Sequence, residues 1–165
     1  MTTARRSLTL AALASFSLPA AVAAQAGTYE IQLLAAPNAA QASGEARLHF
    51  ASSPFGASVT ADGRAIYDVR ITAKGLPAPS SLGAYSAFVA WAATPDLKEW
   101  VRLGPVTNGT STVGPVAMNK FLLVIAAEPS ATVTKHSGPT VLHGTSPSGW
   151  LQSFLTHPLF RGISQ

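Results

Sequence analysis

The 165-residue chain contains no cysteine. It therefore cannot form disulfides, and it lacks the thiolate that blue-copper sites, zinc–thiolate sites and cysteine nucleophiles require. The stability of any domain in this chain must come from the packing of its side chains.

Charged residues are also scarce, at 11% of the sequence, and only seven residues are acidic. Asp62 and Asp68 flank one predicted turn and strand, and Asp96 and Glu99 share a second turn. Because nothing in the sequence marks any acid as buried, we interpret the acids as solubility charges. We expect no carboxylate pair of the kind that hydrolyses glycosides.

Apolar runs long enough to cross a bilayer are absent. The N-terminal residues instead show the three parts of an export signal: Arg5-Arg6, an apolar run from Leu8 to Leu18, and the cleavage motif Ala24-Gln25-Ala26. We predict that residues 1–26 are a cleavable signal peptide and that the mature protein is periplasmic or secreted, without a transmembrane span. The paired arginines leave the general and the twin-arginine export routes open.

The net charge of +4 shrinks once this signal is set aside. The signal holds two of the eleven basic residues and none of the acidic ones, so the rest of the chain carries about +2. A charge this small gives no reason to expect a nucleic acid partner.

The remaining sequence is dominated by short segments with the period of two that half-buried strands show. The alternation is clearest from Tyr67 to Thr72, and it recurs at residues 29–33 and 46–50. Turn signals such as Asp62-Gly63 and Asn108-Gly109 separate the segments. Further short strands are predicted at residues 100–103, 111–116, 132–135 and 140–143.

Two segments are largely apolar, residues 84–93 and 120–127. The first is predicted to be a central strand buried on both faces, and the second is predicted to be another apolar strand. About eight to ten short strands without a long helical period predict an all-β fold. We expect residues 27–145 to form a two-sheet, immunoglobulin-like antiparallel β-sandwich, because a single open sheet would leave apolar faces in water. Residues 146–165 are predicted to add a short C-terminal helix with Ser146 as its N-cap.

The segment from Gly75 to Thr145 resembles the extracytoplasmic C-terminal domain of RskA-type anti-sigma factors. The matching features are Gly75-Leu76-Pro77, a strand with Tyr85 and Trp91, Leu103-Gly104, and Glu128-Pro129 followed by Gly138-Pro139-Thr140-Val141-Leu142. The resemblance implies a small β-sandwich. It does not imply sigma-factor binding, which in that family belongs to a cytoplasmic domain, whereas this chain begins with a predicted export signal.

The stretch from Leu142 to Gly149 is similar to small modules that accompany exported multicopper oxidases. This likeness implies an accessory role beside an oxidase, without a copper-oxidase motif in the chain itself. Ser146 also lies in a glycine-rich stretch, but Ser148 stands where the nucleophile elbow G-x-S-x-G requires glycine. We therefore expect no enzymatic activity.

Three histidines near the C-terminal end, His136, His143 and His157, are candidate ligands for copper or zinc, because neutral imidazole binds both metals. Their spacing fits no compact ligand motif, and surface histidines are the more common case. Copper or zinc handling is kept as an alternative function, and no bound cofactor is expected.

The C-terminal tail carries an apolar set that either folds back over the domain or docks on a partner. Its members are Trp150, Leu151, Phe154, Leu155 and Phe160. We expect a non-enzymatic, exported accessory or interaction module whose partner is another exported protein, such as an oxidase or an envelope assembly. The other alternative is an extracytoplasmic sensor with a small ligand between its sheets.

Overall fold

The computed structural model describes residues 29–54 and 56–147. These residues are mostly β-structure, with two short 3-10 segments, so the expected all-β class is confirmed. The strands are β1 (Tyr29–Ala35), β2 (Ser43–Phe50), β3 (Ser52–Ser53), β4 (Gly56–Ala57), β5 (Tyr67–Lys74), β6 (Ala87–Ala93), β7 (Trp100–Val106), β8 (Gly109–Val116), β9 (Leu122–Glu128) and β10 (Thr140–Thr145). The 3-10 segments are η1 (Pro37–Ala39) and η2 (Pro79–Leu82).

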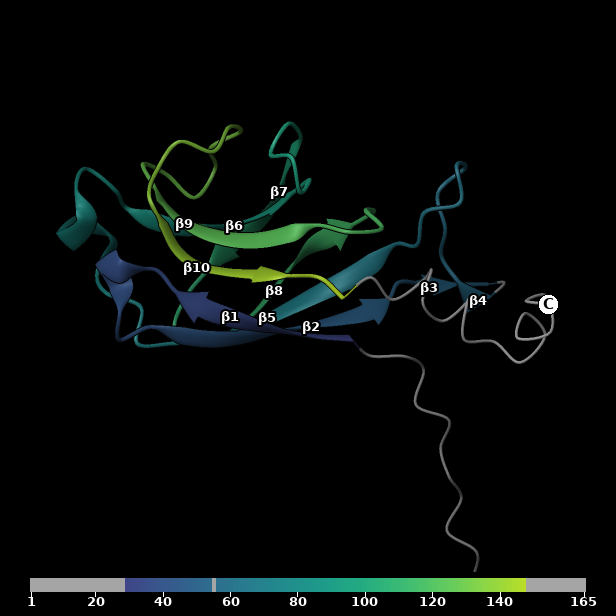
Figure 1. Cartoon of the computed structure of the whole chain (residues 1–165), viewed down its shortest axis with the longest axis horizontal. Helices are drawn as coiled ribbons and strands as arrows, with labels where there is room; N and C mark the ends of the chain where they lie inside the picture. Colours follow the sequence, from purple (N-terminus) through teal and green to yellow (C-terminus); the bar gives the residue numbers. More distant parts are fainter. Residues whose placement is uncertain (1–28, 55, 148–165) are drawn as a thin grey trace, which may run out of the picture.

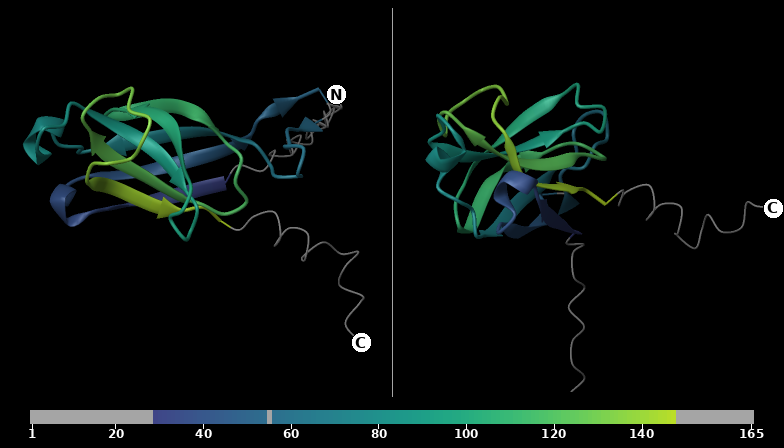
Figure 2. Two further views of the ribbon diagram at one scale, coloured as in Figure 1. Left: turned by 90° about the horizontal axis from the view of Figure 1, so that it is seen from above. Right: turned by 60° about the vertical axis from the view of Figure 1, so that its left-hand side comes forward.

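Eight strands form one antiparallel sheet in the order β7-β6-β9-β10-β1-β2-β5-β8. The sheet folds over on itself, so that β6, β7, β9 and β10 lie opposite β1, β2 and β5 (Figures 1 and 2). The connection between the two halves is narrow, because β1 pairs with β10 only at Leu34 and Ala35. The end strands β7 and β8 follow each other in the chain, and the sheet is nearly closed into a barrel.

The main core fills the space between the two halves of the sheet. In β5 the side chains alternate between buried and outward-facing along the strand, which confirms the period of two predicted from Tyr67 onward. Ile71 from β5 and Ile125 from β9 are fully buried in this core. The alternation arises because successive side chains of a strand point to opposite faces, and only one face meets the core.

Strand β6 is buried on both faces, as its continuous apolar sequence predicts. Phe88 packs in the main core, whereas Val89 and Trp91 belong to a second cluster that also contains Val124 and Ala126 of β9. This second cluster lies on the outer face of the sheet. It is covered by the loop of residues 129–139 between β9 and β10, which we call the strap (Figure 1).

The predicted strand at residues 132–135 is wrong, because the structure has bends and turns there. Within this segment the apolar side chain of Val133 packs on the second cluster and holds the strap against the sheet. At Ser146 the backbone N–H donates to the Phe121 carbonyl, and the hydroxyl accepts from the Phe121 N–H at 2.8 Å. These bonds extend the pairing of β10 with the chain before β9, and the predicted helix that follows lies outside the described residues.

The predicted signal peptide also lies outside the described residues. Among the residues that are described, none belongs to a helix with the length and apolarity that a bilayer crossing needs.

Candidate functional site

Glu128, the last residue of β9, is a fully buried carboxyl group with 0% exposure. Its Oε1 atom accepts hydrogen bonds from His136 Nδ1 at 2.9 Å and from the Ser137 N–H at 3.2 Å. Its Oε2 atom accepts from the Ser137 hydroxyl at 2.9 Å. Burial of an acid is costly unless its oxygens are hydrogen-bonded, and here both are. The carboxyl group therefore fastens the strap to the end of β9.

His136, which is held by Glu128, also contacts an aromatic side chain on β7. Its ring stacks on Trp100, with centroids 4.3 Å apart and an angle of 21° between the rings. The same imidazole lies 5.8 Å from the ring centroid of the buried Trp91. Trp100 is also held by Leu97, whose carbonyl oxygen accepts a hydrogen bond from the indole N–H at 2.9 Å. Trp100 is thus held on one face and at one edge.

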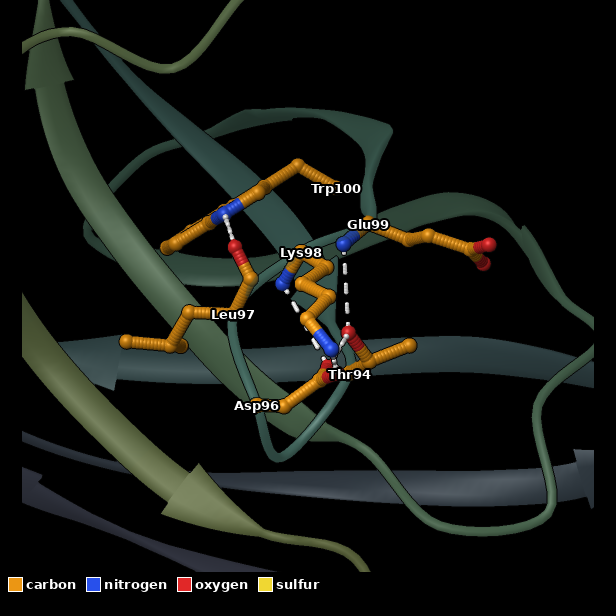
Figure 3. A network of polar contacts seen from close by, with 6 residues as sticks. All are labelled: Thr94, Asp96, Leu97, Lys98, Glu99 and Trp100. Atoms are coloured by element: carbon orange, nitrogen blue, oxygen red, sulfur yellow. Dashed lines mark hydrogen bonds and ion pairs between the residues drawn. The ribbon is translucent and has the colours of Figure 1, made fainter.

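The turn between β6 and β7 is rigid because its own side chains bridge it (Figure 3). Thr94 Oγ1 donates to Asp96 Oδ1 at 2.6 Å and accepts from the Glu99 N–H at 3.1 Å. Lys98 Nζ lies 3.0 Å from Asp96 Oδ2. The Thr94 hydrogen bond, followed by that from Lys98, lowers the pKa of Asp96 below its usual value. Leu97 adopts a φ of 59°, which brings the chain back toward Trp100.

A hollow of about 340 Å³ opens beside this aromatic stack, and we call it the Trp100 hollow. It is lined by Lys98, Trp100, Thr134, Lys135 and His136. Lys98 forms an ion pair with Asp96, whereas Lys135 forms no ion pair with any residue the structure describes. The hollow therefore combines an immobilised aromatic wall with a positively charged rim.

Two buried donors beneath the strap have no acceptor among the described residues: Trp91 Nε1 and Arg102 Nε. Trp91 and Arg102 are direct partners across the β6–β7 pair. The Arg102 Nη2 atom donates to the Ala131 carbonyl, which ties the strap down at a second point. Unpaired buried donors are rare in folded proteins, and both atoms are enclosed behind the wall of the Trp100 hollow and do not line it.

The free edge of β7 is a second candidate surface. One edge of β7 pairs with β6, and no ladder joins the other edge to β8 in the described part of the chain. The two strands approach at Gly114, where an added Cβ would lie 2.9 Å from the Leu103 carbonyl oxygen. Near the start of β7, Leu97 is 52% exposed and Val101 is 42% exposed. Exposed apolar side chains thus accompany an unpaired strand edge.

The candidate metal ligands are not gathered into a described metal site. His136 lies in the strap, and His143 is exposed on β10, opposite Val124. Both lie on the outer side of the sheet, since Val124 also pairs with Trp91. The described residues contain no group of three or more metal-ligating side chains, and His157 lies beyond them. The predicted partner-binding residues Trp150, Leu151, Phe154, Leu155 and Phe160 also lie outside the described residues.

The sequence interpretation missed Glu128, because it treated every acid as a solubility charge. Two signals could have found it. Glu128 continues the outward-facing positions Val124 and Ala126 of a strand that is apolar on both faces. It also begins the Glu-Pro part of the motif that carries the resemblance given above.

The fold and the site together define an antiparallel all-β domain with an anchored loop across its outer face. The chain belongs to the family described as SPbeta prophage-derived uncharacterized protein YoqH, whose model matches residues 34–148. No curated protein and no solved structure gives a significant match. The likenesses to RskA-type domains and to oxidase-associated modules stay predictions.

Proposed function

We propose that this chain is a non-enzymatic, exported protein that acts as an accessory or interaction module of a larger periplasmic or secreted assembly. In this proposal the strand groups β7-β6-β9-β10 and β1-β2-β5-β8 serve as the two layers of an immunoglobulin-like sandwich. The observation that carries the proposal is the unpaired edge of β7 with exposed apolar side chains beside it.

An end strand offers a partner its outward-facing backbone donors and acceptors. In an antiparallel ladder these groups belong to alternate residues. Because β8 runs close to β7 around Leu103 and Gly114, a partner strand would meet the outward-facing groups near the start of β7. Val101 would add an apolar contact there, and Leu97 would add another at the adjoining turn. Trp100 is fixed by Leu97 and His136, so little conformational freedom is lost when a partner packs near it.

The polar cluster around Glu128 supports a binding role over hydrolysis. A serine hydrolase needs a serine hydroxyl at the free nitrogen of a histidine whose other nitrogen contacts the acid. Here Ser137 and His136 both donate to the Glu128 carboxyl group. The serine proton is therefore directed to the acid and not to the histidine.

The test is a pair of variants at exposed valines. Val101→Lys places a charge beside the free edge of β7, whereas Val59→Lys places the same charge at a 59% exposed valine outside the large sheet. We expect a tagged protein to retain its envelope partners with Val59→Lys and to lose them with Val101→Lys, at unchanged melting temperature. Equal retention by both variants would disprove the role of β7. Loss only with Trp150→Ala and Phe154→Ala would transfer the contact to the tail.

Copper or zinc handling is the second candidate function. One observation favours it: metal-ligating histidines commonly donate their other ring N–H to a carboxylate, and His136 does so to Glu128. Titration of the mature protein with Cu²⁺ and Zn²⁺ tests it. Binding no tighter than about millimolar would end this candidate, since isolated imidazoles bind metals that weakly.

A sensor role has one supporting observation as well. A further hollow of about 340 Å³ lies at the end of the sheet, where Leu76, Phe88 and Val106 form part of its lining. These three side chains belong to the main core, so the hollow borders the core between the sheet halves. Thermal-shift screening of small apolar compounds tests this role.

A further inference from the structure

We propose that the Trp100 hollow is a binding site for a carboxylate group, presented by a small organic acid or by an acidic side chain. The site lies on the outer face of the sheet, and its wall residue Trp100 adjoins the edge of β7. Its test is a titration with small ligands and needs no partner strand, so failure of this inference can be told apart from failure of the proposed function.

The charge around the hollow favours an anion. Lys98 and Lys135 both line it, and Lys135 has no acidic partner in the part of the chain that the structure describes. The one buried acid nearby, Glu128, is engaged by three donors from His136 and Ser137. A carboxylate that enters would approach ammonium groups without meeting an unpaired acid of the lining. The same ammonium groups would repel a metal cation.

The wall of the hollow is fixed before a ligand arrives. The His136 ring is held by Glu128 on its Nδ1 edge and by Trp100 on its face. The Trp100 ring is held in turn by the Leu97 carbonyl. Because neither ring must be ordered on binding, a planar ligand can pack against them at low entropic cost. Lys135 can then reach the carboxylate from the rim.

Trp91 and Arg102 lie next to the wall of the hollow without lining it. Trp91 is fully buried, and its indole N–H has no hydrogen-bond partner in the described chain. Its ring neighbours His136, which forms part of the wall of the hollow. Arg102, its cross-strand partner, has an unpaired Nε beneath the same strap. Neither side chain lines the hollow, but the contact of Trp91 with His136 makes the Trp91 indole signal a reporter of the wall.

The experiment compares benzoate with benzamide, which has nearly the same shape and no charge. Each is titrated into the full-length mature protein while the tryptophan indole signals are followed by ¹H–¹⁵N NMR. We expect benzoate, and not benzamide, to shift the indole signals of Trp91 and Trp100. Raising the salt concentration should weaken the binding, because the rim is exposed to solvent.

Matched lysine variants test whether the Lys135 ammonium group binds the carboxylate. Lys135→Gln should weaken benzoate binding about three- to tenfold, as expected for one partly screened charge pair. Lys120→Gln removes an exposed lysine that does not line this hollow and should leave binding unchanged. The inference would be overturned by equal shifts with benzamide or by equal benzoate affinities of the two variants. It would also be overturned if the indole signals did not shift at up to about 50 mM benzoate, since even one charge-assisted contact should give detectable binding at that concentration.

A third titration separates the two sources of the carboxylate. It uses a blocked peptide of alternating Glu and Gly, with a Gln and Gly peptide as its neutral counterpart. Tighter binding of the Glu peptide than of benzoate would assign the hollow to an acidic side chain of a protein. Tighter binding of benzoate would assign it to a small organic acid.

Discussion

The buried carboxyl group of Glu128 allows the sharpest test of how the strap is held. Replacing Glu128 by Ala leaves three donors without an acceptor: His136 Nδ1, the Ser137 N–H and the Ser137 hydroxyl. An unsatisfied buried donor costs about 1–3 kcal/mol, and the missing side chain adds a cavity. Because the strap can rearrange to reach water, we expect a total of about 3–5 kcal/mol, the range for breaking one side of a buried polar network.

Glu128→Gln keeps the shape of the side chain and one acceptor oxygen. The bonds from His136 and the Ser137 N–H can remain on that oxygen, and the Ser137 hydroxyl can rotate to accept from the amide. What is lost is the charge assistance, worth about 1 kcal/mol per bond, while the cost of burying a charge disappears. We expect a net loss of about 1–2 kcal/mol for Gln, clearly smaller than for Ala.

Hydrogen exchange and near-ultraviolet circular dichroism report this loss where it occurs. The strap can open locally without unfolding the sheet, so the free energy should appear first in the Ser137 amide. For Glu128→Gln, a loss of 1–2 kcal/mol corresponds to about 5- to 30-fold faster exchange of that amide. The near-ultraviolet signal of Trp91 and Trp100 should weaken in the same order, because His136 packs on both rings.

Glu45→Gln provides the control, because it removes a half-buried acid whose ion-pair partner Arg47 also contacts Glu30. It should change the free energy of unfolding by less than about 0.5 kcal/mol. If Glu128→Gln and Glu128→Ala both behaved like this control, the carboxyl group would not be what holds the strap. Equal and large effects of the two variants would instead show that the negative charge itself, and not the count of acceptors, is required.

Two further predictions concern the sheet. Burial, and to a smaller extent the neighbouring Tyr29, raises the pKa of the Tyr67 phenol. A raised folded-state pKa stabilises the fold fully below the unfolded-state pKa of ~10, and this contribution is lost as the pH rises through the folded-state pKa. Urea unfolding between about pH 8 and 11 should therefore show a loss of unfolding free energy at alkaline pH that Tyr67→Phe reduces. An equally steep loss in Tyr67→Phe would refute this prediction. At Gly138 an added Cβ would lie 1.6 Å from the Ala127 carbonyl oxygen. Gly138→Ala must displace the strap from β9, so we expect a melting temperature lower by at least about 5 °C, and an unchanged value would contradict this close approach.

Local alternation was sufficient to predict several strands. In β5 the apolar residues fall on one face because the other face meets water, and the period of two is visible in the sequence itself. The same pattern misled at residues 132–135, where Val133 lies between two threonines as it would in a strand. There its burial comes from contact with the second cluster of the outer face, and a contact between distant segments leaves no periodic trace.

The Asn108-Gly109 pair shows a similar division. Its sequence predicts the turn between β7 and β8, and Gly109 has the expected positive φ of 100°. The structure adds a second role for Asn108, whose side-chain amide accepts from the Leu76 N–H and donates to the Leu76 carbonyl. Leu76 is 32 residues away in the chain, so no local pattern could reveal this bond.

The sequence by itself determined the all-β class, most strand positions and the absence of thiol chemistry, because these depend on side-chain period and composition. Only the tertiary structure decided that Glu128 is buried, that His136 stacks on Trp100, and that β7 ends the sheet with an unpaired edge. Those features arise where β6, β9 and the strap meet. Their energies depend on which distant groups exclude water from one another, and a linear sequence records the groups without recording their neighbours.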